Sequence, residues 1–320
     1  MSRIRSSLVT AAVAGAVLAP AATAQGAPTT LAVEQAPTRV AAWNGVAMWS
    51  RFDAATQTYS LVKSVDGGAP TRVAVAPRAG GPFDIDMGTS RSAQTYAVYT
   101  RDDGDVYRLN VTTGSEAKVA NLSSPTLDER DPTIMRGQIA FIRRERGYDQ
   151  LRIGDTSADA RGSRLLVKRR SIVHAELGTT HVAYLTTGPG PMSDNGSRYM
   201  HIRNLRTGAD RRVYRAVSGG ANWANTTRPT YIADPAAFVW ARTNNGSGTG
   251  NRIVRYTLRG SQLGYAPGSP RYRSTAWAGD ALGAVTSGSL DGETQGACTD
   301  GGVNYCQVTL TGPLQFNLRP

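Results

Sequence analysis

The sequence predicts an all-β protein, a six-bladed β-propeller of four-stranded blades. Three observations predict it: a short Ala-centred apolar motif occurs six times, an alternating strand follows each copy, and no long amphipathic helix interrupts the pattern. The copies are centred near residues 47, 97, 140, 183, 239 and 283, so neighbouring copies are 43 to 56 residues apart. A repeat of this length is typical of propeller blades.

Residues 1–24 have the features of a secretory signal peptide. Arg3 and Arg5 form a basic start, an apolar stretch follows at residues 8–18, and Ala22-Thr23-Ala24 supplies small residues for cleavage. The apolar stretch is about eleven residues long, whereas a helix needs about 20 to span a bilayer. We therefore expect a secreted or extracytoplasmic protein that does not span the membrane, with a single propeller domain at residues 25–320.

Each repeat should contain an entry strand, the Ala-centred central strand, an alternating third strand and a short outer strand. The second repeat shows this best: residues 96–99 are central, residues 106–109 alternate apolar and polar side chains, and residues 118–120 form the outer strand. A small Ala lets neighbouring sheets approach, while Trp49 and Trp240 fill the remaining space. A pair of β-sandwiches has no reason to repeat one motif six times, and a β-helix or other solenoid is the remaining alternative.

The unit from Tyr96 to Val119 resembles the TolB-type, WD40-like propeller repeat of exported bacterial proteins. In that repeat an aromatic or Ala-rich strand precedes a strand such as residues 105–110, and a Thr-Gly turn like Thr113-Gly114 follows. The Ser-Pro-Asp-Gly turn of the family is absent from every unit. The resemblance implies a rigid six-bladed propeller used for binding, often of other proteins.

Charge and cysteine content indicate the kind of partner and the compartment. The formal net charge is +12, but the arginines are scattered along the chain rather than gathered with aromatic residues, which argues against nucleic acid as a partner. A protein, or an anionic polymer such as a cell-wall component, stays open as a partner, and we expect a monomer. The two cysteines, Cys298 and Cys306, predict a disulfide in an exported chain.

Polar residues on the predicted entry strands are the candidate ligand-binding residues, because entry strands line the channel of a propeller. They are Arg39, Asp84, Asp86, Arg130, Asp131, His174, Glu176, Arg228 and Arg273. Carboxylates beside arginines can hold an anionic or sugar-like ligand through charge-assisted hydrogen bonds, or they can neutralise one another around a wet tunnel. Long insertions at residues 187–197, 243–251 and 288–302 predict a binding face at one end of the ring.

Motifs of catalysis and of metal binding are not evident in the sequence. There is no Gly-x-Ser-x-Gly elbow, and His174, His181 and His201 lack the spacing of zinc ligands. The acidic runs at residues 84–86 and 102–105 do not follow a calcium loop, so no cofactor is predicted and calcium is the alternative. We therefore expect a non-enzymatic binding scaffold outside the cytoplasm. The alternatives are a polysaccharide-active hydrolase or lyase using channel-mouth carboxylates, and a purely structural surface protein.

Overall fold

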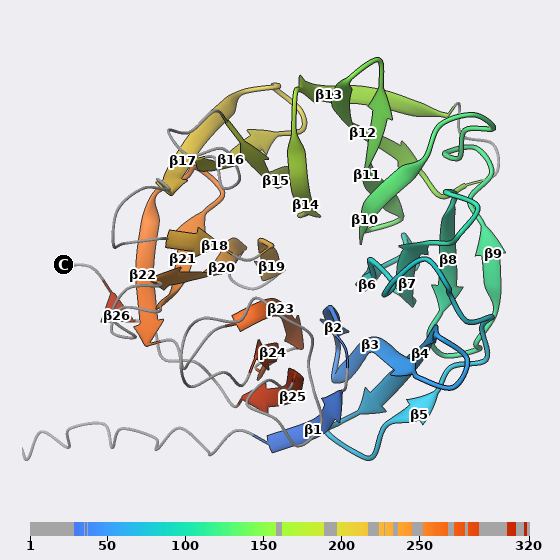
Figure 1. Ribbon diagram of the computed structural model, residues 1–320. Coiled ribbons are helices and arrows are strands. Elements are labelled where there is room, and N and C mark those ends of the chain that lie inside the picture. The colour runs from blue at the N-terminus through green and yellow to red at the C-terminus, as the bar shows by residue number, and fades with distance from the viewer. Residues whose placement is uncertain are drawn as a thin grey trace, which may run out of the picture.

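The computed structural model describes residues 29–34, 36, 38–157, 162–188, 197–216, 224–226, 228–232, 236–244, 252–267, 272–278, 281–287, 306–311 and 317–318. Every regular element in these ranges is a β-strand, and the sheets stand around a common axis (Figure 1). No helix of the described ranges has the length and apolarity that crossing a bilayer requires. The predicted signal peptide, residues 1–24, lies outside the described residues and stays a prediction.

Five antiparallel sheets have four strands each, and one sheet has six. Sheet 1 contains β2 (Val40–Trp43), β3 (Val46–Asp53), β4 (Thr58–Val65) and β5 (Thr71–Arg72). Sheet 2 contains β6 (Asp86–Thr89), β7 (Thr95–Thr100), β8 (Val106–Asn110) and β9 (Glu116–Lys118). Sheet 3 contains β10 (Glu129–Met135), β11 (Gln138–Glu145), β12 (Tyr148–Asp155) and β13 (Ser163–Arg169). Sheet 4 contains β14 (Ile172–Leu177), β15 (His181–Thr187), β16 (Arg198–Asn204) and β17 (Asp210–Ala216).

The last two sheets depart from the simple order of the first four. Sheet 5 contains β18 (Ala224–Thr226), β19 (Thr230–Ile232), β20 (Ala237–Asn244), β21 (Arg252–Thr257), β22 (Gln262–Pro267) and β26 (Asn317–Leu318). Sheet 6 contains β23 (Tyr272–Ala278), β24 (Ala281–Ser287), β25 (Cys306–Thr311) and, at its edge, β1 (Thr29–Glu34). The N-terminal strand therefore completes a sheet whose other strands come from the C-terminal part of the chain (Figure 1).

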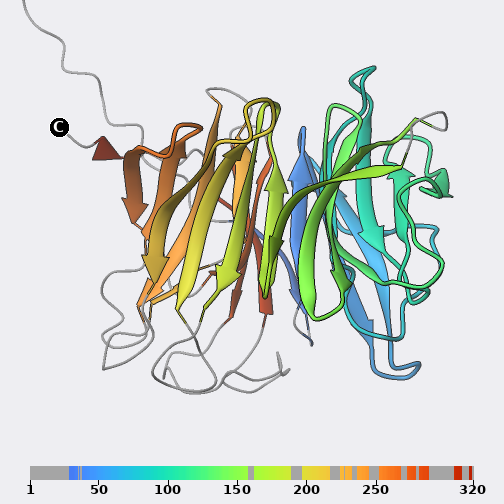
Figure 2. The same ribbon diagram turned by 90° about the horizontal axis from the view of Figure 1, so that it is seen from above.

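The innermost strands of the sheets form a continuous ring. Contacts run from β2 to β6, β10, β14, β19 and β23, and β23 contacts β2 again. Seen from the side, the strands run from one end of the ring to the other (Figure 2). Because each entry strand begins at the same end, the residues at these starts gather around one end of the axis.

Tight turns at two-residue loops set the strand register. Asn44 and Gly45 join β2 to β3, and Arg146 and Gly147 join β11 to β12; all four residues have positive φ. Positive φ at both central positions is the geometry whose twist suits a two-residue hairpin. At Gly45 a Cβ would approach the Asp66 carboxylate to 2.3 Å, so the Asp66 side chain would have to move to admit one.

The core lies between the sheets, as the motif predicted. The central alanines Ala47, Ala97, Ala140 and Ala183 are buried, and beside them Trp49, Tyr99, Phe141, Tyr184 and Trp240 are fully buried. One apolar cluster joins sheets 3, 4 and 5, and others join sheet 1 to sheet 2, sheet 1 to sheet 6, and sheet 2 to sheet 3. Sheet faces that would otherwise meet water are thereby covered by their neighbours.

The prediction of six blades of four strands is correct for five sheets and wrong for sheet 5. There, β18 and β19 pair with opposite ends of β20, so two short strands stand where one entry strand was expected, and β26 adds to β22. Pro229 lies between β18 and β19 and cannot donate to a strand ladder, which accounts for the interruption. The three predicted insertions lie almost entirely outside the described residues.

Candidate functional site

Irregular pairing marks the start of several entry strands. The register of β10 with β11 shifts between Arg130 and Thr133, and Asp131 has a φ of 52°. Similar shifts occur between Ile172 and His174 of β14 and between Tyr272 and Ser274 of β23. A bulge turns a side chain away from the direction that regular pairing would give it, and bulges are frequent beside active sites. The bulges thus lie beside Asp131 and His174 at the axis.

Asp131, His174 and Arg39 meet at this end of the ring although they come from three different sheets. The Arg39 Nη1 donates to Asp131 Oδ1 at 2.5 Å, and its Nη2 lies 3.2 Å from His174 Nδ1. His174 Nδ1 is also 3.3 Å from Asp131 Oδ1. The Asp131 side chain is buried, whereas those of His174 and Arg39 are 26% and 18% exposed. This group, called the axial triad below, has a buried carboxylate behind a partly exposed imidazole and guanidinium.

The surroundings of the axial triad set the charge of its members. Burial would raise the pKa of the Asp131 carboxyl, but the charges of Arg39 and Arg228, together with the hydrogen bond from His174, hold that pKa well below its usual range. Burial lowers the pKa of His174, against the attraction of Asp131. In the tautomer of neutral His174 that carries its hydrogen on Nδ1, the imidazole donates a hydrogen bond to the ionised Asp131 carboxylate. That tautomer leaves a lone pair on Nε2.

Arg228 lies at the axis, on the inner side of the axial triad, and its guanidinium fills the space between the entry strands. Its Nε donates to the Ala175 carbonyl at 3.2 Å and its Nη1 to the Ile85 carbonyl at 3.0 Å, joining sheets 4 and 2. Its Nη2 lies 3.3 Å from Glu176 Oε2 and 3.6 Å from Asp86 Oδ1. Burial would lower the pKa of Arg228, yet the charges of Asp131, Asp86 and Glu176 raise it. Its Nη2 also donates to the Pro132 carbonyl of sheet 3 at 3.5 Å, so the guanidinium ties sheets 2, 3 and 4 to the segment that leads to β19 of sheet 5.

Glu176 and Asp86 are packed around Arg228 and do not face an open site. A void of only about 10 Å³ lies beside them, which is about the size of one water molecule. Burial and the neighbouring charge of Asp86 raise the pKa of Glu176 well above its usual range, although Arg228 opposes this. A sugar ring has no room there, so these two carboxyls belong to the interior of the axis.

Side-chain acceptors on one entry strand bind backbone N–H groups of the next. Asp84 Oδ2 accepts from Asp131 N at 2.7 Å, and Asp131 Oδ2 accepts from Ala175 N at 2.7 Å. Deeper along the axis, the same kind of bond joins three more pairs: Asp86 Oδ2 with Ile134 N at 2.9 Å, Thr133 Oγ1 with Leu177 N at 3.0 Å, and Glu176 Oε1 with Tyr231 N at 3.0 Å. We call these bonds the axial clips. They link sheets 2 to 5 to one another, whereas the hydrogen bonds of each strand ladder stay within one sheet.

Most of the sequence-predicted site residues thus meet at the axis. Arg130 does not: its guanidinium binds Asp149 and the Ile172 carbonyl, both at 2.9 Å, between sheets 3 and 4. Arg273 lies in β23, and its side chain lies outside what the structure describes. Thr133 was missed by the sequence reasoning, because a lone Thr in an apolar strand gives no signal of a clip.

The two acidic runs hold no evident calcium site. Both Asp84 oxygens accept hydrogen bonds from Thr100 and Asp131 N, and both Asp102 oxygens accept from the backbone at Ala79 and Gly80. Within the described ranges, no three His, Cys, Asp or Glu side chains are grouped so that they could hold a metal ion. The predictions about cofactors stay predictions, as does the disulfide, because Cys298 lies outside the described residues and Cys306 is described only as the first residue of β25.

Comparison with known proteins finds solved structures with a similar fold but identifies no family for the chain. No protein-family profile matches the chain, and no curated protein matches it. Among solved structures, an oligogalacturonate lyase in complex with manganese has a TM-score of 0.52 at 13% identity, covering 84% of this chain and 80% of that one. The α-L-arabinofuranosidase Arb93A from Fusarium graminearum, with an iminosugar inhibitor, has a TM-score of 0.55 at 11% identity, covering 90% and 98%. The same organism's enzyme with arabinobiose has a TM-score of 0.53.

These comparisons correct the expectation of a non-enzymatic scaffold. The similar structures named above are those of enzymes, a lyase and an arabinofuranosidase. The resemblance to the TolB-type repeat is matched by no family profile and stays a prediction. At identities of 13% and below, no residue role passes from these enzymes to this chain. What they and the sheet arrangement establish together is the architecture: the chain is a β-propeller built of antiparallel blades.

Proposed function

We propose that this protein is a glycan lyase, an enzyme that cleaves uronate-containing polysaccharide by β-elimination at the axial triad. The observation that carries the proposal is the contact of His174 with buried Asp131 and with Arg39 at the axis. A β-elimination needs a base to remove the proton next to the sugar carboxylate and a cation to stabilise the charge that develops there. The axial triad offers one of each.

The roles follow from the geometry of the axial triad. Asp131 orients the imidazole through Nδ1, which directs the basic Nε2 away from the carboxylate. Nε2 would remove the proton at C5 of the uronate, and the electron pair of that bond would form the C4=C5 double bond. The C4–O bond then breaks, and the departing oxygen takes a proton from water. Arg39, which is partly exposed, would stabilise the negative charge that develops on the uronate carboxylate.

Hydrolysis by paired carboxyls has less support from the same residues. A glycosidase of the usual kind places an acid and a second carboxylate on either side of the glycosidic bond, several ångströms apart. Glu176 and Asp86 are both within 3.6 Å of Arg228 Nη2, and the void beside them is about 10 Å³. Their oxygens also serve as axial clips. Elimination by a partly exposed histidine therefore fits the axis better.

Incubation of the purified protein with oligogalacturonate tests the proposal. We expect product with the ultraviolet absorbance of a conjugated C4=C5 bond, and a loss of about 100-fold or more in kcat for His174→Ala, as expected for removal of a general base. Because burial lowers the pKa of His174, the acid limb of the activity profile should lie below the ordinary histidine pKa of 6.5.

The matched control is His181→Ala, which alters a histidine that bonds Thr180 and Asn204 at the start of β15. It should retain activity. New reducing ends without the absorbing double bond would indicate hydrolysis and contradict the elimination step. Full activity in His174→Ala would remove His174 from the mechanism.

The remaining expectations from the sequence are part of this proposal. We propose that the chain is exported after cleavage near residue 24, because a glycan-degrading enzyme has its polymeric substrate outside the cytoplasm. We also propose that the six-stranded sheet serves as the sixth blade, with the pair β18 and β19 in the place of one entry strand. Its support is the contact of β19 with β14 on one side and with β23 on the other.

A further inference from the structure

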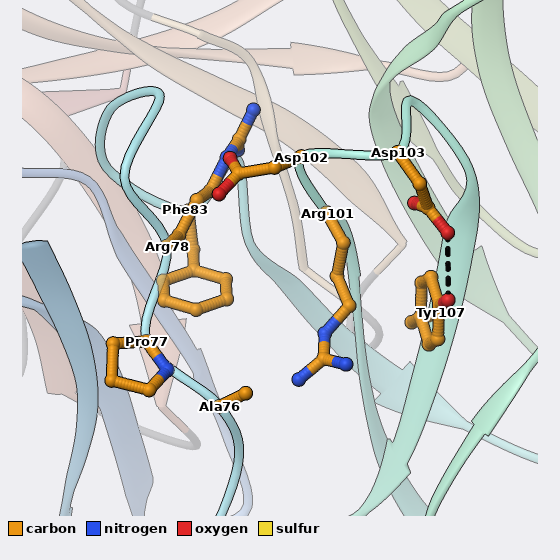
Figure 3. A pocket seen from close by; sticks show the side chains of 8 residues that line it. All are labelled: Ala76, Pro77, Arg78, Phe83, Arg101, Asp102, Asp103 and Tyr107. Atoms are coloured by element: carbon orange, nitrogen blue, oxygen red, sulfur yellow. Dashed lines mark hydrogen bonds and ion pairs between the residues drawn. The ribbon is translucent and has the colours of Figure 1, made fainter.

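A pocket of about 240 Å³ lies between sheets 1 and 2, where the β5–β6 connection faces the β7–β8 turn (Figure 3). It is lined by Ala76, Pro77, Arg78, Phe83, Arg101, Asp102, Asp103 and Tyr107. Its volume is somewhat below the range of about 300–1,000 Å³ in which drug-sized ligands bind. This cavity, called the rim pocket here, is therefore suited to a single small ring.

The acceptors of the rim pocket already have partners. Asp102 accepts from Ala79 N at 2.8 Å, Gly80 N at 3.2 Å and Arg78 Nε at 3.2 Å. Asp103 accepts from the Tyr107 hydroxyl at 2.8 Å. The charge of Asp102 is offset by Arg78, and Lys118 Nζ lies 3.8 Å from Asp103. The two carboxylates thus hold the walls of the pocket in place and leave little of their own capacity for a ligand.

Arg101 is the group with unused hydrogen-bonding capacity. Its Nε pairs with Glu116 Oε1 at 3.2 Å, and its guanidinium carbon lies 4.9 Å from the centre of the Tyr107 ring. Its Nη2 is buried and has no hydrogen-bond partner within the described part of the chain. The side chain is 24% exposed, and its guanidinium group is directed into the pocket between Ala76 and Tyr107 (Figure 3). Leaving a charged donor without an acceptor is costly, so a carboxylate that enters the pocket beside the exposed part of the Arg101 side chain is favoured.

The rim pocket is joined to the axial triad by polar contacts. Arg78 Nη1 lies 3.8 Å from Asp84 Oδ1, and Asp84 Oδ2 accepts from Asp131 N at 2.7 Å. Phe83 N is fixed by Ser50 Oγ at 2.8 Å, so the connection that leads to β6 is held against sheet 1. The pocket and the triad therefore lie along one connected path at the end of the ring where the entry strands begin.

We propose that the rim pocket is a second sugar subsite, which binds the carboxylate of a further uronate unit through Arg101. The inference rests on the proposed function for its substrate class and adds a specificity residue away from the reacting bond. A guanidinium presents a planar pair of donors that matches a carboxylate, and Pro77 and Ala76 supply an apolar wall for a sugar ring. An enzyme with such a subsite requires at least two uronate units in the glycan and binds neutral glycans poorly.

Binding measured by calorimetry tests this subsite separately from turnover. The titrations use oligogalacturonate and, as a neutral probe, arabinobiose, with the full-length protein carrying His174→Ala so that no substrate is consumed. We expect binding of oligogalacturonate, and a loss of affinity on the order of tenfold when Arg101→Met is added, since charge-assisted hydrogen bonds are lost. Arabinobiose should bind at least tenfold more weakly than oligogalacturonate.

Two further variants keep the test decisive. Ala76→Trp fills the pocket from an exposed position without changing any charge, and it should weaken binding as Arg101→Met does. Arg146→Met removes one positive charge from a side chain that is 90% exposed in the β11–β12 turn, and it should leave affinity unchanged. Equal affinity in Arg101→Met and its parent, or equal binding of the two probes, overturns the subsite. Binding that depends on Arg101 in a protein without turnover supports the subsite while removing the proposed lyase activity.

Discussion

His174 and Glu176 lie two residues apart on β14 and face the axis together, yet their side chains meet different surroundings. His174 is partly exposed and contacts Arg39 and Asp131, whereas Glu176 is buried against Arg228 and Asp86. The pKa of Glu176 is raised well above its usual range by burial and by Asp86, and that of Asp131 is held well below it by nearby cations despite burial. Within one cluster, the surroundings thus favour the protonated form of the Glu176 carboxyl and the ionised form of the Asp131 carboxyl.

This difference predicts opposite effects of two isosteric substitutions on stability. Because the folded state holds the Glu176 proton to higher pH than the unfolded chain does, stability falls as pH rises from about 4.5 through the folded pKa. Glu176→Gln keeps an oxygen for Tyr231 N and cannot ionise. Its free energy of unfolding should exceed that of the parent at neutral pH by on the order of 1 kcal/mol, and the excess should vanish in acid. Urea denaturation at several pH values measures this.

Asp131→Asn is the contrasting variant. In the parent protein, the ionised Asp131 stabilises the folded state at every pH above its unfolded pKa of about 3.9. This stabilisation is lost only as pH falls through the lower folded pKa. The substitution removes the carboxylate that pairs with Arg39 and that offsets part of the charge of Arg228, and we expect a loss of about 3–5 kcal/mol at neutral pH. A gain of stability in Asp131→Asn, or a loss in Glu176→Gln, would contradict the assigned charges.

At the scale of the strand, the axial clips connect elements that the sheet ladders leave separate. Each clip joins a side chain of one entry strand to a backbone N–H of the next, as Thr133 Oγ1 does for Leu177 N at 3.0 Å. Both groups are buried, so water cannot replace the lost bond. The clips therefore fix the height of neighbouring blades along the axis as well as adding stability.

Thr133→Val tests one clip without changing the volume of the side chain greatly. It leaves the Leu177 N–H buried and unpaired, and we expect a loss of about 1–3 kcal/mol in the free energy of unfolding. Thr133→Ser retains the hydroxyl and should lose less, since only a methyl group is removed. Chemical denaturation of both variants gives the comparison, and equal losses would assign the effect to packing instead of the hydrogen bond.

For the whole molecule, ring closure depends on β1. This strand pairs with β25 from Thr29 to Glu34 at the edge of sheet 6. Glu34 is buried and accepts from Trp49 Nε1 of sheet 1 at 2.7 Å, and it also binds Arg51 at 3.1 Å. The first strand thus joins sheet 6 to sheet 1. The ring is closed there by contacts between the N-terminal and the C-terminal parts of the described chain.

Deletion of residues 29–34 should therefore open the ring. We expect a lower Tm and a less cooperative transition in calorimetry, because β25 becomes an unpaired edge and the Trp49 indole loses its acceptor. Glu34→Gln is the milder comparison: it keeps an acceptor for Trp49 and should retain a single transition. A deletion variant that unfolds as the parent does would show that the ring closes without this strand.

Local patterns were sufficient for much of this architecture. Each of three patterns involves only a few consecutive residues: the Ala-centred strand, the alternating third strand and a turn such as Asn44-Gly45. The structure has strands and turns at these positions. Among the polar entry-strand residues, Asp86, Asp131, His174, Glu176 and Arg228 contact one another or Arg39 at the axis, Arg130 does not, and the side chain of Arg273 lies outside what the structure describes. Asp131-Pro132 carries a sequence signal for the bulge, because Pro within a strand is found at edges and bulges.

The sequence by itself determined the strand content and the repeat, since side-chain period and turn chemistry act over a few residues. Only the tertiary structure decided which charges meet. Arg39 binds Asp131 across 92 positions of sequence, and Arg228 reaches the Ile85 carbonyl across 143. Such contacts depend on the angle and height at which whole sheets pack around the axis, and that packing is set by the sum of many apolar contacts between blades rather than by any one segment.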